Sequence, residues 1–290
     1  FLSPRSPWPL LATFLALVRR SAASDRLTST ASSNEVPRAL RRTNSLLVPV
    51  STNSRFALDR FIEDGTGAAK ATFEATMQRT LRDTERFRRI VADRAFHLAY
   101  QPVVSLADES LHHCEALARF DADGSPADTI RLAEELDMIQ DFDLAVAEQV
   151  TRVLTTGQGV RIAVNISSRS LMQTGFVERL LNVTRRIRRD DLLFEITESA
   201  ALGDLTLANH QIQLLRQAGH EVCLDDFGAG SATLEYLRDL HVDFLKIDGR
   251  YIREVENDSR GVILLRHLVA MCRELNVPTI AEMVEGRETA

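Results

Sequence analysis

The sequence predicts an α/β fold, a TIM-type β/α barrel that is modified by one antiparallel strand. From Phe96 onward, short apolar runs alternate with helix-forming stretches, which is the pattern of repeated β/α units. Polar residues end several of these runs, as they do where a β/α barrel presents ligands at the carboxyl ends of its strands. Only Ala107–Glu109 separates the first two runs, which is too short for a parallel crossover, so this pair is predicted to be antiparallel.

Residues 1–60 are predicted to be a disordered or linker segment left from an upstream region, because Ser21–Ser54 is rich in Ser, Thr, Arg and Asn and has few aromatics. They hold nine Arg against three acidic residues, although the whole chain has a net charge of −6. The apolar run Trp8–Val18 is too short to span a bilayer. A signal-peptide core, the stub of a membrane segment and a short helix all stay open for it, and membrane contact by this segment has no further support.

Residues 61–95 are predicted to form an amphipathic connector helix, because helix formers dominate from Ala68 onward. Six apolar residues recur there at roughly helical spacing: Phe73, Met77, Leu81, Phe87, Ile90 and Val91. One interpretation is a signalling or dimerising helix, which would make the chain a homodimer. We favour the other, in which the apolar stripe packs on the barrel, because a coiled coil needs more sustained heptads.

Residues 96–290 are predicted to be the main domain. Seven strands are expected, at 97–104, 111–118, 161–166, 192–196, 221–225, 243–247 and 279–283. Helices are expected between most of them, at about 127–138, 141–155, 169–187, 204–218, 231–239 and 259–275.

Carboxylate and amide side chains at the ends of these strands are the strongest functional signal: Glu115, Asn165, Glu195, Asp225, Asp226 and Glu282. Hard oxygen ligands suit Mg²⁺ or Mn²⁺ rather than zinc. Neighbours on a strand point to opposite faces, so Asp225 and Asp226 can face one site only if the backbone turns there. The glycines in Phe227–Gly230 make that turn plausible on steric grounds.

Lys246 is one of only two Lys, against 33 Arg. Because Lys offers a compact point charge that the planar Arg does not, we expect a Lys at this position to have a specific role. The alternative is a purely structural role, in which a buried Lys246 is paired with a carboxylate. His112 and His113 are adjacent on a predicted strand, and we interpret both as structural. The three Cys, at 114, 223 and 272, lack metal-ligand spacing and are interpreted as buried free thiols.

The motifs as a set resemble the EAL domain family. Those motifs are YQP at 100–102, EALAR at 115–119, AVNIS at 163–167, FEITES at 194–199, DDFGAG at 225–230 and KID at 246–248. The resemblance implies a modified barrel with one reversed strand and metal-dependent hydrolysis of cyclic di-GMP to pGpG in bacterial second-messenger signalling. It also implies a cytoplasmic domain, and it leaves membrane association of a full-length parent open. A nucleic-acid polymer is not expected as a partner of this acidic domain.

The resemblance also implies roles for individual residues. Glu115, Asn165, Glu195 and Asp225 would bind a first Mg²⁺ or Mn²⁺, Asp226 a second, and Glu282 would complete the ligands. Lys246, together with Glu115, would be catalytic. Glu198 would anchor the loop at 227–231, and Asp248 would be mainly structural. Substrate contacts would come from Gln101, Leu117 and Arg119, the last by forked contact with a phosphate.

The chain departs from the family at a few positions. Ala229 and Ser231 replace the usual Thr and Tyr of the DDFG loop, and Met283 replaces the usual Gly of AEGVE. After Ala290 a last strand and helix are expected and are not in the sequence, which we interpret as a C-terminal truncation.

Two other functions stay open at this point. The domain could bind cyclic di-GMP without cutting it and transmit the event through the helix at 61–95. Carboxylates on successive strands with a Lys also suit Mg²⁺-assisted proton abstraction, as in enolase-like barrels. The paired Asp225 and Asp226 and the amide of Asn165 favour two metals, so this last alternative ranks lowest.

Overall fold

The computed structural model describes residues 69–120, 125–156, 159–197, 204–228, 234–257 and 259–284. The predictions for residues 1–60, for Trp8–Val18, for Glu198 and for Ala229 and Ser231 lie outside these ranges. Among the helices of the described ranges, none combines the length and the apolar character that crossing a membrane requires.

The described chain separates into two compact units. One comprises Leu98–Leu117 and the residues from Asp143 onward, and it holds the sheet. The other comprises, among the described residues, 69–97 together with those of Ala118–Phe142, and it holds the long helix that precedes the sheet.

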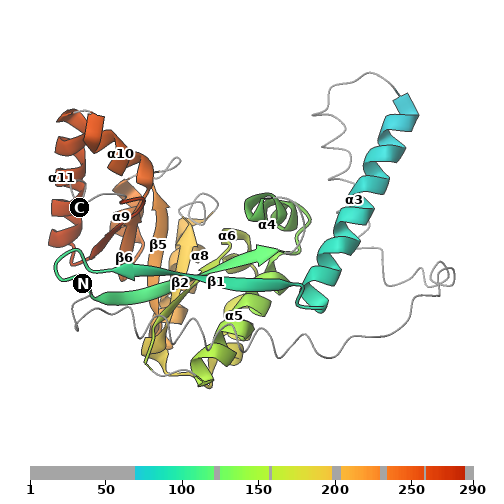
Figure 1. Cartoon of the computed structure of the whole chain (residues 1–290), viewed down its shortest axis with the longest axis horizontal. Coiled ribbons are helices and arrows are strands. Elements are labelled where there is room, and N and C mark those ends of the chain that lie inside the picture. The colour runs from blue at the N-terminus through green and yellow to red at the C-terminus, as the bar shows by residue number, and fades with distance from the viewer. Residues whose placement is uncertain are drawn as a thin grey trace, which may run out of the picture. The chain divides into compact units, whose positions relative to one another are not determined.

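The sheet confirms the predicted α/β fold and its antiparallel first pair. Seven strands lie in sequence order, and from β2 onward neighbouring strands are parallel (Figure 1). A tight turn after β1 returns the chain as β2, with Ser105 N–H donating to the Ser110 carbonyl at 2.9 Å. The strands are β1 Phe96–Val104, β2 Leu111–Phe120, β3 Ile162–Ile166, β4 Leu192–Thr197, β5 Glu221–Phe227, β6 Phe244–Ile247 and β7 Thr279–Ala281.

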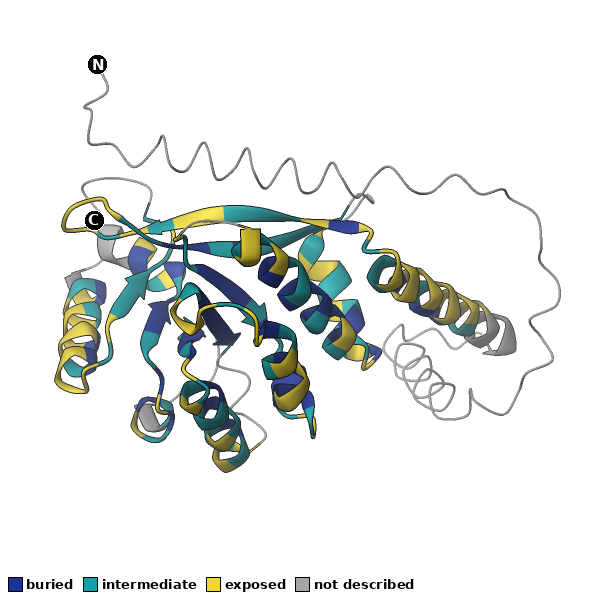
Figure 2. Cartoon of the chain, turned by 90° about the horizontal axis from the view of Figure 1, so that it is seen from below, coloured by how far each residue is buried: buried dark blue, intermediate teal, exposed yellow. Residues whose placement is uncertain are grey.

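Helices follow most of the parallel strands, with their apolar sides buried and their outer sides exposed (Figure 2). They are α4 Pro126–Glu135, α5 Ile139–Thr156, α6 Ser168–Leu171, α7 Phe176–Thr184, α8 Leu205–Gln217, α9 Leu234–Asp239, α10 Gly249–Asn257 and α11 Ser259–Glu274, with a 3₁₀ turn at Arg189–Asp191.

Two helical predictions were wrong in detail. The single helix expected over 169–187 is two helices, because Gly175 adopts a φ of 75° between α6 and α7. The helix α10 was not predicted. It begins directly after Asp248, whose Oδ1 accepts a hydrogen bond from the Arg250 N–H at 2.7 Å and so caps the new helix.

The inner face of the sheet carries a compact apolar layer. Ala163, Leu193 and Cys223 are fully buried on β3, β4 and β5, and Phe244 and Ile280 pack against them from β6 and β7. Side chains two residues apart on a strand share a face. The residue two positions beyond each of these five therefore lies on the same face, nearer the carboxyl ends of the strands.

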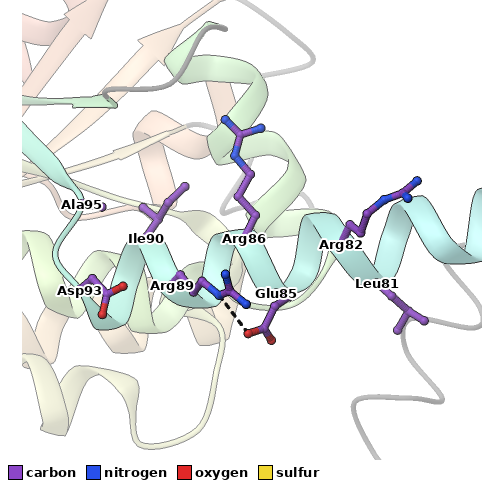
Figure 3. A pocket seen from close by; sticks show the side chains of 8 residues that line it. All are labelled: Leu81, Arg82, Glu85, Arg86, Arg89, Ile90, Asp93 and Ala95. Carbon is purple, nitrogen blue, oxygen red and sulfur yellow. Dashed lines mark hydrogen bonds and ion pairs between the residues drawn. The ribbon is translucent and has the colours of Figure 1, made fainter. Parts of the chain in front are cut away.

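The second unit is built around four phenylalanines. Phe87 of helix α3 (Ala69–Ala92) has its ring centroid 5.9 Å from that of Phe142, which also contacts Phe96 at 5.1 Å and Phe120 at 5.6 Å. A surface groove also borders α3, and in it Arg89 pairs with Glu85 at 3.2 Å (Figure 3). The apolar side of α3 at Phe87 thus packs inside its own chain.

Candidate metal centre

The polar residues that the sequence singled out form one layer above the apolar layer of the sheet. Counting two residues on from Ala163, Leu193, Cys223, Phe244 and Ile280 gives Asn165, Glu195, Asp225, Lys246 and Glu282. The strand register aligns Asn165 with Glu195. The structure therefore brings together side chains from β3, β4, β5, β6 and the end of β7, and Glu115 joins them from β2.

Asp225 and Asp226 both face this layer because β5 is irregular between them. Asp226 has a φ of 57°, and the register of β5 with β6 shifts between Leu224 and Phe227. An extra residue in the left-handed region makes a bulge and resets the alternation of side chains. The left-handed residue thus lies within the strand, one residue before the segment 227–230 where the sequence analysis expected the turn, and Gly228 of that segment also has a positive φ, of 91°.

The ammonium group of Lys246 lies at the centre of the layer. Its Nζ is 3.0 Å from Asp225 Oδ1, 3.1 Å from Glu282 Oε1, and 3.5 Å from both Glu115 Oε2 and Glu195 Oε2. Its side chain is only 4% exposed, so solvent screens these attractions little. One buried cation is therefore shared among four carboxylates.

Burial and the neighbouring carboxylates outweigh Lys246 in setting the pKa values of two carboxyls of this layer. Burial raises the pKa of Glu195 well above its usual range, and Glu115 and Asp225 add to the effect against the opposing Lys246. Burial likewise raises the pKa of Glu282 to about 7. Burial alone would lower the pKa of Lys246, but the carboxylates outweigh it and raise that pKa.

The donor set fits divalent cations. Carboxylate oxygens of Glu115, Glu195 and Asp225 lie within 4.8 Å of one another, and those of Asp225, Asp226 and Glu282 form a second such group. Both oxygens of Glu195 are buried and have no hydrogen-bond partner among the described residues. A buried carboxylate needs a paired charge or a metal ion, and Lys246, at 3.5 Å from Oε2, is shared with three other carboxylates. The layer is therefore an acidic cluster consistent with a metal site.

The amide of Asn165 is already oriented in this cluster. Its Nδ2 donates to Glu115 Oε1 at 3.0 Å, which leaves its oxygen as a ligand atom. Asp225 belongs to both groups of carboxylates and therefore links them.

The remaining predicted residues do not join the cluster through any contact of the described residues. Asp248 caps α10 and pairs with Arg250 at 2.9 Å, which is a structural role. Gln101 is exposed on β1, and Leu117 is half-buried two residues beyond Glu115. The guanidinium of Arg119 donates from Nη1 to the Ala118 carbonyl at 2.9 Å.

Sequence reasoning missed one neighbour of the cluster. His113 is fully buried, with its Nε2 3.8 Å from Glu195 Oε1. Its position two residues before Glu115, on the same face of β2, was the signal that could have found it.

The departure at Met283 places a side chain where the backbone favours glycine. Met283 has a φ of 52°, in the left-handed region that is sterically costly for residues with a Cβ atom. Its side chain is seated against Gly249, where a Cβ atom would lie 2.5 Å from the Met283 sulfur.

The chain is similar to known EAL proteins over most of its described length. The sequence profile of the EAL domain matches residues 84–290. The cyclic di-GMP phosphodiesterase NbdA of Pseudomonas aeruginosa is 30% identical over 227 residues, which are 74% of this chain and 28% of that protein. The cyclic di-GMP phosphodiesterase PdeF of Escherichia coli K12 is 29% identical over 227 residues, 73% of this chain and 30% of that protein.

Solved structures give the same result for the fold. The phosphodiesterase PaMucR in complex with cyclic di-GMP has a TM-score of 0.65 and 29% identity, over 72% of this chain and 89% of that one. The chain spans half or less of the length of the curated relatives it matches first.

Proposed function

Because the chain belongs to the EAL domain family, we propose that it is a metal-dependent phosphodiesterase that hydrolyses cyclic di-GMP to linear pGpG. The observation that carries the proposal is the convergence of Lys246 with carboxylates from four strands or their ends in one buried layer. The names of its relatives, which include cyclic di-GMP phosphodiesterases, support this substrate.

Two cations, Mg²⁺ or Mn²⁺, fit the two groups of carboxylates. Glu115, Asn165, Glu195 and Asp225 would hold the first, while Asp226 would hold the second together with Asp225 and Glu282. Bound there, such ions lower the pKa of a water molecule and neutralise charge on a phosphodiester. The raised pKa values of Glu195 and Glu282 mean that both carboxyls release protons when they bind cations.

Lys246 would change partners during catalysis. Without cations, its ammonium pairs with four carboxylates and so reduces the repulsion among them. With cations bound to those carboxylates, the ammonium of Lys246 would be free to donate hydrogen bonds to the attacking water and to a phosphoryl oxygen. The water oxygen would bond to phosphorus, the bond from phosphorus to the 3′ oxygen would break, and one proton of the water would end on that oxygen.

Gln101, Leu117 and Arg119 would contact the substrate, as the family resemblance implies. Leu117 shares its face of β2 with Glu115, which places it beside the cluster. Arg119 would need to release the Ala118 carbonyl to present its fork to a phosphate. We place the reaction in bacterial second-messenger signalling, in the cytoplasm.

The test is turnover of cyclic di-GMP with Mn²⁺ by the 290-residue chain and two variants. Glu115→Ala removes a cation ligand, and Lys246→Met removes the ammonium while keeping a long side chain. Both are expected to lose at least about a hundredfold in kcat, whereas Glu135→Ala, an exposed residue at the end of α4, keeps the wild-type rate. Wild-type turnover by Glu115→Ala would sink the assignment.

A further inference from the structure

Met283 is the most exposed sulfur-containing side chain of this protein. It is 55% exposed, and the three cysteines are buried. The other four methionines are only partly exposed: Met77, Met138, Met172 and Met271. Oxidation of thioethers and thiols follows their exposure. A mild oxidant in solution therefore reaches the sulfur of Met283 before any other sulfur of the chain.

The thioether of Met283 also connects the ends of two strands. Met283 lies two residues beyond β7, and Gly249 lies two residues beyond β6 and is buried. A Cβ atom on Gly249 would be 2.5 Å from the Met283 sulfur, 2.6 Å from its Cγ and 2.9 Å from its Cβ. The side chain of Met283 therefore lies flat against the glycine, and it ties the end of β7 to the start of α10.

This contact supports a backbone conformation that methionine disfavours. Met283 has a φ of 52°, and a residue with a Cβ atom keeps such an angle only where its surroundings enforce it. Glu282 precedes it directly, with its N–H donating to the Ile247 carbonyl at 3.2 Å and its Oε1 3.1 Å from Lys246 Nζ. The placement of the Glu282 carboxylate thus depends on the conformation of Met283.

We propose that Met283 is a modification site, at which a peroxide oxidises the thioether to a sulfoxide and thereby weakens the cation site that contains Glu282. The sulfur attacks one oxygen of hydrogen peroxide, the oxygen–oxygen bond breaks, and the other oxygen leaves as water. The thioether loses two electrons and the peroxide gains them. The product is polar where the thioether was apolar.

The sulfoxide cannot keep the contact with Gly249. The buried glycine leaves no space for an added oxygen on its side of the sulfur, so the polar side chain turns toward solvent. The left-handed backbone at Met283 then loses the packing that offsets its strain, and it relaxes toward a negative φ. This relaxation moves Glu282 away from Asp225 and Asp226, the other two carboxylates of its group.

The part of this inference that concerns cations rests on the proposed function, but the loss of packing does not. The first experiment therefore treats the cation-free 290-residue chain with hydrogen peroxide and follows each methionine by peptide mass spectrometry. We expect Met283 to gain an oxygen about tenfold faster than the four partly exposed methionines. Equal rates at all five would overturn the proposal.

Urea unfolding of the same samples in EDTA tests the contact with Gly249. The midpoint should fall once Met283 is oxidised, because the strained backbone has lost its packing. Met283→Leu, which cannot be oxidised at this position, is the matched control and should unfold at the same midpoint before and after peroxide. An unchanged midpoint in the oxidised wild type would overturn the proposal without any reference to metal.

Calorimetry then measures Mn²⁺ affinity. The oxidised chain is expected to bind Mn²⁺ about tenfold more weakly, and to recover when methionine sulfoxide reductases restore the thioether. Met283→Gln, which is polar and of similar length, should bind as weakly as the oxidised chain without any peroxide. The affinity of Met283→Leu should not respond to peroxide.

Equal Mn²⁺ affinity before and after oxidation of Met283 would overturn the proposal. A chain that binds no Mn²⁺ even before oxidation would contradict the proposed function instead, and the urea midpoints would then decide the present inference. If Met283→Leu fails to fold, Met283→Gly takes its place as the control, because glycine has no sulfur and accepts the left-handed angle.

Discussion

Replacing Glu282 by Gln should stabilise the metal-free protein, and should do so more at high pH than at low pH. Glu282 is held near Lys246 and Asp225, and burial raises its pKa from 4.5 to about 7. Below about pH 4.5 the carboxyl is protonated in both the folded and unfolded states. As the pH rises toward 7, the unfolded chain loses this proton first, so the free energy of unfolding falls.

The size of this loss follows from the two pKa values. The loss is about 0.8 kcal/mol at pH 5 and about 3.4 kcal/mol at pH 8.5, a difference of about 2.5 kcal/mol. Gln resembles the protonated carboxyl and has no proton to lose. The advantage of Glu282→Gln over the wild type should therefore grow by about 2.5 kcal/mol between these pH values.

Urea unfolding in the presence of EDTA measures this difference directly at pH 5 and pH 8.5. Glu135→Gln, which changes an exposed carboxylate, is the matched control and should show no such pH dependence. Saturating Mn²⁺ should remove the wild-type loss at pH 8.5, because the cation balances the ionised carboxylate. A variant whose advantage is the same at both pH values would refute the interpretation that burial of Glu282 outweighs its pairing with Lys246.

Three further outcomes are expected. Met283→Gly should raise the free energy of unfolding by about 1 kcal/mol by relieving its left-handed backbone, whereas Met283→Ala should not; a loss of stability in the glycine variant would contradict this. Phe142→Ala should cost about 3–5 kcal/mol in urea unfolding by opening the phenylalanine cluster, and exposed Leu81→Ala under about 0.5; similar costs for both would refute that packing. Mn²⁺ binding at pH 6 should release protons, seen by calorimetry in buffers of different ionisation enthalpy; identical heats after buffer correction would oppose it.

The general fold could be predicted because its signals are local. Apolar runs that alternate with helical stretches gave the β/α order, and the short turn at Ala107–Glu109 gave the antiparallel first pair. The helix α10 was missed because a glycine and charged residues open it, and its start depends on a cap by Asp248. The break at Gly175 depends on a backbone angle that a glycine permits but does not require.

The members of the acidic cluster could be predicted, but their partners could not. The same-face rule places Glu195 above Leu193 and Lys246 above Phe244 from the sequence alone. Lys246 contacts four carboxylates because of how the strands twist and stagger against one another. No local sequence pattern encodes that arrangement of the strands. The bulge at Asp226 is likewise set by the pairing of β5 with β6.

The most direct measurement is cyclic di-GMP turnover by the 290-residue chain after its divalent cations have been stripped with EDTA and Mn²⁺ has then been restored. We expect no product from the stripped chain, and conversion of cyclic di-GMP to pGpG once Mn²⁺ is present. Cyclic di-GMP that binds to the Mn²⁺-loaded chain but stays uncut would contradict the phosphodiesterase, and would make this protein a receptor.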